Sequence, residues 1–440
     1  MLLGLQWGDE GKGKVVDALT PRYDVVARFQ GGPNAGHTIE FGGKKFVLHN
    51  VPSGVLTPGC TNYIGSGVVI EPHILKGECV SLYEAGFDLQ KRLFIANRAH
   101  LILPTHRAMD AANEKALGKM KIGSTLKGIG PTYTDKTARK GLRIGDINSP
   151  DFREKYENLK KAHLQQIASL GFNMQGFKLD GLDFAEYETL WFEGIEYMKQ
   201  YQFVDGEYWI NEQLNSKKNV LGEGAQGSML DVDFGSYPFV TSSSVIAAGV
   251  CSGLGVAPSR IGKVYGIFKA YCTRVGAGPF PTELFDKTGE DLLNNGHEFG
   301  ATTGRPRRCG WLDLPALKYA VMLSGVTDLM MMKSDVMDEF ETIKVATAYR
   351  YHGKEIQHLP FAACTETMEP VYTEFQGWDS VIDENDGTIT PNLENYIRFI
   401  EDYVGVPVKF VSYGPDRTQN IWRRWLLSSH KRVLRHPFFH

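Results

Sequence analysis

Short apolar runs recur along the chain and alternate with longer amphipathic segments. The runs are rich in Val, Ile and Phe, which is typical of β-strands, and they cover residues 25–29, 46–48, 93–96, 101–103, 264–268, 343–349 and 406–411. Apolar strands that alternate with helices are typical of parallel sheets covered on both sides. The pattern therefore predicts an α/β fold with a large, mostly parallel central sheet flanked by helices.

Two helical patterns stand out between these runs. The first follows Ser149 and Pro150, a favourable N-cap and first-turn pair, carries apolar residues on one face and stops at Gly171. The second covers residues 183–201. No internal repeat, low-complexity tract or linker divides the chain, so we expect one large domain with inserted helical lobes over residues 1–421.

The overall composition is that of a globular protein, with 42% hydrophobic and 22% charged residues among 440. The net charge of −3 gives no reason to expect a nucleic-acid ligand. No apolar run approaches the roughly 18–20 residues that span a bilayer, so we expect no membrane association. The six cysteines show neither close pairing nor zinc-type spacing, which indicates reduced thiols and a cytoplasmic location.

Residues 8–14 form a candidate phosphate site directly after the opening apolar segment. They fit the G-x-x-x-x-G-K part of a phosphate loop, in which backbone N–H groups and a helix N-terminus bind phosphates. Val15 stands where an ordinary phosphate loop has the Ser or Thr that binds Mg²⁺. A bound phosphate would repel Asp9 unless this carboxylate binds the metal or takes a proton from the acceptor. That points away from a simple GTPase, although a tight glycine turn with two solvated lysines is the plain alternative.

Two further glycine-rich loops carry polar candidates. Residues 31–38 contain three glycines, which permit close backbone approach to a ligand, and His37, which can exchange a proton at neutral pH. A lone histidine is nevertheless more often structural. Residues 122–131 supply hydroxyl groups and flexible backbone, the composition of an anion pocket. Arg139 follows in the basic stretch 136–140, for which a solvated charged surface is the usual outcome.

Residues 300–311 place three arginines within a Gly/Thr-rich loop, here called the arginine loop. Arg305, Arg307 and Arg308 suit bidentate binding of carboxylates or phosphates. A dicarboxylate fits this loop better than nucleic acid does, because no wider basic stripe surrounds it.

The sequence Lys-Ser-Asp ending at Asp335 follows an apolar run and offers a base-specific contact. A carboxylate at this place can accept both the N1–H and the 2-amino protons of guanine, and adenine lacks that pair of donors. Such an aspartate would select GTP over ATP. The polar segments 223–227, 241–244 and 412–417 carry little information individually.

In this order, these segments resemble the adenylosuccinate synthetase family from about residue 3 to residue 418. The most specific stretches are residues 6–14, 30–38, 128–131, 275–283 and 300–311. The resemblance implies GTP-dependent ligation of IMP and L-aspartate to adenylosuccinate, GDP and phosphate through a 6-phosphoryl-IMP intermediate, the first committed step of AMP biosynthesis. It further implies Mg²⁺ as the cofactor and a homodimer.

The resemblance also assigns roles to individual residues. Asp9 would be the general base that removes the N1 proton of IMP and a Mg²⁺ ligand together with the carbonyl of Gly36, and His37 would be the general acid for phosphoryl transfer. The catalytic set comprises Asp9, Lys12, His37 and Gln226. The IMP set is Asn34, Thr125, Arg139, Gln226, Thr241 and Arg305, with Arg139 reaching the neighbouring subunit's site. The aspartate set is Ala301, Thr302, Thr303, Arg305 and Arg307. The GTP set is Gly8, Asp9, Glu10, Gly11, Lys12, Gly13, Lys14, Gly36, His37, Thr38, Arg307, Lys333, Ser334, Asp335, Ser412, Tyr413 and Gly414.

The sequence also departs from the family pattern, and two rival functions stay open. Because the arginines on both sides of Pro306 match the family, we expect the role of the arginine loop to be kept. Pro306 separates Arg305 from Arg307, and residues 422–440 do not resemble the usual ending of the family. We expect a divergent, disordered tail there, for which a frameshift or read-through and simple divergence are both open. A P-loop GTPase or nucleotide kinase would need a Ser or Thr after Lys14. A non-catalytic nucleotide-binding protein would not need Asp9, Lys12, His37 and Arg305 together.

Overall fold

The computed structural model describes residues 1–423 except 35, 42–43, 119–120, 301–303 and 367. Its centre is a sheet that has ten strands among these residues, in the order β11-β7-β5-β2-β12-β1-β13-β17-β21-β22. The strands are β11 Gln202–Val204, β7 Leu93–Ala96, β5 Thr61–Ile64, β2 Val25–Arg28, β12 Val220–Gly227, β1 Leu2–Gly4, β13 Tyr265–Lys269, β17 Asp328–Met332, β21 Val408–Ser412 and β22 Asn420–Trp422. Every neighbouring pair is parallel except β21 and β22, which confirms the predicted fold class.

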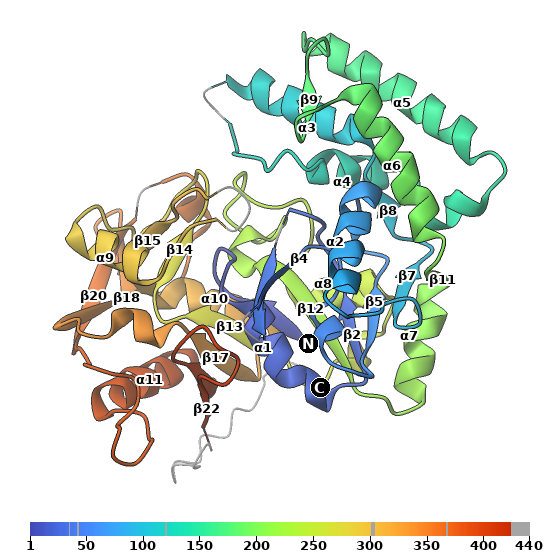
Figure 1. Cartoon of the computed structure of the whole chain (residues 1–440). Helices are drawn as coiled ribbons and strands as arrows, with labels where there is room; N and C mark the ends of the chain where they lie inside the picture. The colour runs from blue at the N-terminus through green and yellow to red at the C-terminus, as the bar shows by residue number, and fades with distance from the viewer. Residues whose placement is uncertain (35, 42–43, 119–120, 301–303, 367, 424–440) are drawn as a thin grey trace, which may run out of the picture.

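Helices cover both faces of this sheet, as the buried strands require (Figure 1). All residues of β2 and β17 are buried, so neither face of these strands is left to solvent. The helices are α1 Lys12–Leu19, α2 Pro72–Glu84, α3 Pro104–Leu117, α4 Ile129–Ala138, α5 Phe152–Ser169, α6 Phe184–Met198, α7 Gly206–Asn215, α8 Ala247–Leu254, α9 Lys287–Asn295, α10 Leu314–Ser324 and α11 Pro391–Val404.

Helices α3 to α6 form a lobe on one side of the sheet (Figure 1). The predicted helix after Ser149 is α5, but it begins at Phe152, because Ser149 closes a preceding 3₁₀ turn with its N–H on the carbonyl of Asp146 (2.9 Å). The predicted strand 101–103 is also shorter than expected. Strand β8 covers only His100–Leu101, since Leu103 is the N-cap of α3.

Smaller sheets contain the remaining strands. The antiparallel pairs are β3 His37–Phe41 with β4 Lys44–Leu48, β9 Lys178–Leu179 with β10 Leu182–Asp183, and β14 Cys272–Arg274 with β15 Arg308–Gly310. The pair β6 Val69–Ile70 and β8 is parallel, and β18 Thr342–Tyr351 joins β16 Leu312–Asp313, β19 Lys354–Ile356 and β20 Glu369–Gln376. The predicted strands 46–48 and 343–349 therefore exist, but they lie outside the central sheet, because an apolar run does not specify which sheet it joins.

The end of the described chain belongs to the fold. The ring of Trp422 packs edge-on against Phe410, with centroids 5.1 Å apart. The guanidinium of Arg423 donates to the carboxylates of Glu394 (2.8 Å) and Glu401 (2.7 Å) on α11. Residues 424–440, most of the segment predicted as a tail, lie outside the described residues.

The parallel topology brings the predicted site segments to one place. The segments after β1, β2, β12, β13, β17 and β21 all leave the sheet at its carboxyl edge, because these strands run in the same direction. Ligands of open α/β sheets bind outside this edge. Residues far apart in the sequence can therefore meet there.

Candidate active site

The phosphate loop, residues 8–14, connects β1 to α1 and bends sharply. Gly8 and Gly11 both have φ of 88°, in the left-handed region that favours glycine, and Asp9 has φ of 57°. The helix α1 then begins at Lys12, so the unpaired N–H groups of its first turn lie beside the loop. This is the strand–loop–helix context that phosphate binding requires.

Glu10 and Lys12 form the buried interior of this loop. The carboxylate of Glu10 accepts the N–H groups of Gln6 (3.1 Å) and Gly8 (3.0 Å) and pairs with Nζ of Lys12 at 2.6 Å. A Cβ at Gly4 or Gly227 would lie 2.3 or 2.2 Å from a carboxylate oxygen of Glu10, so both glycines are needed for this packing. Glu10, predicted as a GTP contact, thus shapes the loop and orients Lys12.

Asp9 links the phosphate loop to the arginine loop. Its carboxylate is 41% exposed and accepts hydrogen bonds from Nε (2.9 Å) and Nη2 (2.8 Å) of Arg307. The other terminal nitrogen of Arg307 donates to Glu298 at 2.6 Å. Two segments that the sequence separates by 298 positions are therefore in direct contact at the sheet edge.

His37 forms a buried pair with Glu223 of β12. Its Nδ1 lies 2.5 Å from a Glu223 oxygen, and the backbone N–H and hydroxyl of Ser53 donate to the same carboxylate at 2.9 and 2.5 Å. Burial, reinforced by the charge of Arg28, lowers the pKa of His37. Burial opposes ionisation of Glu223, yet His37, Arg28 and Ser53 together lower its pKa to about 2.

These contacts define the protonation of the pair. An ionised Glu223 requires the His37 proton on Nδ1, which leaves a lone pair on Nε2. That Nε2 atom is buried and has no hydrogen-bond partner among the described residues. Sequence reasoning missed Glu223 and Ser53 as partners of His37, and no local motif marks either of them.

The predicted IMP residues divide into two groups. Gln226 at the end of β12, with φ of 58°, donates to Oδ1 of Asn34 at 3.2 Å, and the Gln226 backbone lies against Gly8 of the phosphate loop. Thr241 is half-buried, whereas Thr125 and Arg139 are exposed on the lobe side, with Arg139 at the end of α4. The structure thus joins Asn34 and Gln226 directly and leaves Arg139 facing solvent.

The predicted guanine residues also meet at the sheet edge. Nζ of Lys14 donates to the Ser412 hydroxyl (2.8 Å) and the Gly414 carbonyl (2.7 Å), and the Ser334 hydroxyl donates to the Ser412 carbonyl (2.7 Å). Burial lowers the pKa of Lys14 to about 8. Lys14 therefore fixes the 412–414 segment.

The neighbouring Asp335 is half-buried, and its Oδ1 has no hydrogen-bond partner among the described residues. Burial raises the pKa of this carboxyl group. Tyr413, between Ser412 and Gly414, is half-buried.

Part of the predicted aspartate site lies outside the described residues, namely Ala301, Thr302 and Thr303. Arg305 follows them and is exposed. Gly36 is half-buried before His37, and the side chain of Thr38 is likewise outside the description. Gly13 lies in the first turn of α1.

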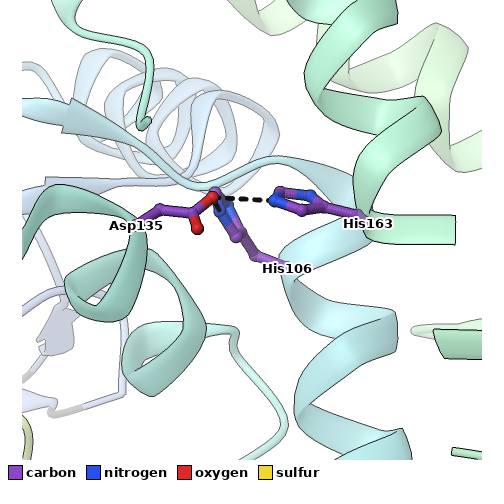
Figure 2. Close-up of side chains that lie close together, drawn as sticks. All are labelled: His106, Asp135 and His163. Atoms are coloured by element: carbon purple, nitrogen blue, oxygen red, sulfur yellow. Dashed lines mark hydrogen bonds and ion pairs between the residues drawn. The ribbon is translucent and has the colours of Figure 1, made fainter. Parts of the chain in front are cut away.

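A second group of titratable side chains lies in the helical lobe (Figure 2). His106 of α3 and His163 of α5 both place Nε2 on one oxygen of Asp135 of α4, at 3.0 and 2.7 Å. Within the described part of the chain, this is the one group of three or more His, Cys, Asp or Glu residues with the spacing of a metal site.

The hydrogen bonds of this group argue against a metal site. The backbone N–H of Leu103 donates to Nδ1 of His106 at 2.9 Å, so the neutral ring carries its proton on Nε2 and donates it to Asp135. A metal-bound histidine shows the opposite arrangement and donates from its other nitrogen. We therefore describe these residues as the lobe cluster, a set of hydrogen bonds that joins α3, α4 and α5.

Comparisons with known proteins give the family of this chain. The sequence model described as adenylosuccinate synthetase matches residues 1–421. The chain belongs to the adenylosuccinate synthetase family. Relatives named adenylosuccinate synthetase from Bacteroides fragilis and Porphyromonas gingivalis are each 57% identical to it, over 96% of this chain and 98% and 99% of theirs.

A solved structure supports the same assignment. The fully ligated adenylosuccinate synthetase of Plasmodium falciparum is 36% identical and superposes with a TM-score of 0.88 over 96% of this chain and 99% of its own. A cyanophage succinoaminodeoxyadenylate synthetase, 20% identical with a TM-score of 0.61, shares the fold. Among the described helices of this adenylosuccinate synthetase family member, none is long and apolar enough to cross a bilayer.

Proposed function

We propose that this chain ligates IMP and L-aspartate, with GTP, to give adenylosuccinate, GDP and phosphate. It is a ligase of purine biosynthesis that forms a carbon–nitrogen bond. The observation that carries the proposal is the contact between Asp9 and Arg307. It places a carboxylate in a phosphate loop directly beside an arginine suited to a dicarboxylate, an arrangement that a simple GTPase or nucleotide kinase does not need.

The chemistry explains why a base belongs beside the phosphates. The O6 oxygen of IMP cannot leave as it stands. When Asp9 takes the N1 proton, the electrons move to O6, which attacks the γ-phosphorus of GTP and releases GDP. The amine of aspartate then adds to C6, loses a proton and expels O6 as phosphate, so that a carbon–nitrogen bond replaces the carbon–oxygen bond.

His37 and Lys12 support phosphoryl transfer in this proposal. Nε2 of the neutral ring carries a lone pair, so His37 acts as an acid only after this atom has taken up a proton. The ionised Glu223, which accepts the Nδ1 proton, would stabilise the imidazolium that then donates from Nε2 to the phosphoryl group. Lys12, oriented by Glu10, supplies a positive charge beside the phosphates. Positioning and charge neutralisation dominate such reactions.

Mg²⁺ fits the residues at the head of the phosphate loop. The Asp9 carboxylate is a hard oxygen donor on the exposed side of the loop. It would bind Mg²⁺ together with the backbone carbonyl of Gly36. Bound there, Mg²⁺ would neutralise charge on the triphosphate. Arg307 donates to this carboxylate and holds it on the exposed side of the loop.

The remaining residues bind the substrates. Asn34, Thr125, Gln226, Thr241 and Arg305 hold IMP, and Arg139 completes the IMP site of a second subunit in a homodimer. One oxygen of Asp335 has no hydrogen-bond partner in the described part of the chain, and it would accept from guanine, with Lys333, Ser334, Ser412, Tyr413 and Gly414 around the base. Within the arginine loop, Ala301, Thr302, Thr303, Arg305 and Arg307 bind aspartate. The reaction takes place in the cytoplasm.

A spectrophotometric assay with single omissions tests this function. IMP, GTP, Mg²⁺ and aspartate are mixed, and each component is left out in turn while the absorbance change of the purine is followed. We expect product only in the complete mixture and a much slower reaction when ATP replaces GTP. Product without aspartate, equal rates with ATP, or GTP hydrolysis independent of IMP would contradict the proposal.

A further inference from the structure

Glu298, which follows α9, is a carboxylate at the sheet edge that accepts hydrogen bonds from four side chains. Its side chain is fully buried, and one oxygen accepts Nζ of Lys269 (2.8 Å), the hydroxyl of Tyr271 (2.6 Å) and Nζ of Lys333 (2.8 Å). The other oxygen accepts Nη1 of Arg307 (2.6 Å). One carboxylate therefore fixes three cationic side chains, and we call this set the Glu298 cluster.

The cations of the cluster come from three different segments. Lys269 ends β13, and its register partner Met332 ends β17, so that Lys333 leaves the sheet beside it. Arg307 comes from the arginine loop and reaches on to Asp9. Glu298 thus lies between the proposed guanine pocket, through Lys333, and the proposed phosphate and aspartate sites, through Arg307.

The charges of the cluster are unbalanced in favour of cations. Lys269 and Glu298 are fully buried and cannot exchange their partners for water. Burial lowers the pKa of Lys269 to about 8, even though the charge of Glu298 opposes this effect. Burial also opposes ionisation of Glu298, but the charges of Lys269, Lys333 and Arg307 lower its pKa well below the usual range. Three cations around one carboxylate leave positive charge at an edge that receives phosphates and a dicarboxylate.

We propose that Glu298 is a positioning residue that fixes Lys333 for GTP and Arg307 for the phosphate and aspartate sites. This inference rests on the proposed function. Without the carboxylate, Lys333 and Arg307 would repel each other and Lys269. Both side chains would then lose conformational freedom when a ligand binds, which would weaken binding. The IMP residues Asn34 and Gln226 do not contact this cluster, so IMP alone should not depend on it.

The substitution Glu298→Gln tests the geometry with little change in volume. An amide offers one acceptor and one donor, so either Arg307 or the two lysines and Tyr271 must face an N–H group. We expect KM for GTP and for aspartate to rise roughly 10- to 100-fold, since hydrogen bonds between charged groups are lost. The dissociation constant of IMP alone, measured by calorimetric titration, should change less than about twofold.

Two further variants keep the test decisive. Tyr271→Phe removes one hydrogen bond to Glu298 without removing charge and should raise the same two KM values roughly 2- to 10-fold. Glu71→Gln is the matched control, because Glu71 is also fully buried but accepts from the hydroxyl of Tyr187 on α6 and the N–H of Ile74 on α2. We expect wild-type kinetics from this control.

The outcomes separate a positioning role from a general structural one. Unchanged KM values for GTP and aspartate in Glu298→Gln, or an equal loss of IMP affinity, would overturn the proposal. If that variant does not fold, unchanged values in Tyr271→Phe would overturn it. A wild-type chain that makes no adenylosuccinate would overturn the proposed function, and the positioning role with it, a result that the parallel wild-type assay identifies separately.

Discussion

The Glu298 cluster and the lobe cluster both gather several partners around one buried carboxylate, but the partners differ in charge. Glu298 holds Lys269, Lys333 and Arg307, which are cations. Asp135 holds two histidine rings that donate from Nε2, and burial lowers the pKa of one of them, His106, to about 4. The Glu298 cluster therefore carries an excess of positive charge, and the lobe cluster does not.

This difference distinguishes a ligand site from a purely structural hydrogen-bond network. Asp135, His106 and His163 have the spacing of a metal site, but every ring nitrogen already has a hydrogen-bond partner. In the Glu298 cluster, the fixed side chains extend to Asp9 and to the guanine side of the sheet edge. We therefore expect changes at the sheet edge to alter turnover and changes in the lobe cluster to alter stability.

The largest expected effect on this comparison comes from Asp9→Asn. An amide cannot take the N1 proton of IMP, so kcat should fall by about 10²- to 10⁴-fold. The unfolding midpoint should hardly move, because the Asp9 side chain is 41% exposed and its pair with Arg307 is partly solvated. Initial rates and thermal melts on the same sample measure both quantities. Wild-type turnover of Asp9→Asn, or a large loss of its stability, would contradict the claim that the sheet edge serves catalysis and the lobe cluster serves stability.

A smaller loss of rate is expected from Glu223→Gln. The neutral amide still occupies the space beside His37 but no longer stabilises the imidazolium ring, so kcat should fall roughly 10- to 100-fold. The control is Glu71→Gln, another fully buried carboxylate, which should leave kcat unchanged. A pH–rate profile checks the assignment. A profile that keeps its wild-type shape and height would show that Glu223 only fills space.

In the lobe, Asp135→Ala should affect stability. It leaves two buried N–H donors without an acceptor, which should lower the free energy of unfolding by about 3 kcal/mol. Urea denaturation measures the change, and Glu193→Ala serves as the control in the same lobe, because its surface pair with Lys76 should contribute less than about 1 kcal/mol. A rate loss in Asp135→Ala as large as that of Asp9→Asn would contradict the comparison.

The smallest expected effect is a pH dependence of stability from His106. Burial lowers the pKa of this ring from about 6.5 to about 4 in the folded chain, so the unfolded chain binds its proton first. The contribution of His106 to the free energy of unfolding is therefore complete above about pH 6.5 and is lost as the pH falls towards 4. Urea midpoints between pH 7 and pH 4 should fall less steeply in His106→Gln than in the wild type. Parallel slopes would show that His106 does not titrate in this way.

Local sequence patterns predicted the parts of the site that lie within a few residues of one another. The phosphate loop with Asp9, the His37 loop and the Lys333–Asp335 segment all follow strands of the central sheet as expected. The parallel sheet itself followed from apolar runs that alternate with helices. The strand at 343–349 joined a different sheet, since periodicity reports burial and not the pairing partner.

The partners of these residues were beyond sequence reasoning. Glu223 lies 186 positions from His37, and Ser53 contacts Glu223 from a 3₁₀ turn with no chemical motif. Glu298 meets Lys269 and Lys333 only after three segments have converged at the sheet edge. Such contacts depend on strand register and on how the loops approach one another. Local sequence patterns do not report either of these.

The central claim is that a carboxylate inside the phosphate loop activates the purine oxygen, and a crystal structure with IMP, a non-hydrolysable GTP analogue and Mg²⁺ tests it most directly. We predict that an oxygen of Asp9 lies about 2.6–3.2 Å from N1 of the hypoxanthine ring, within reach of the proton it removes. An Asp9 side chain turned away from both the ring and the cation would contradict the account.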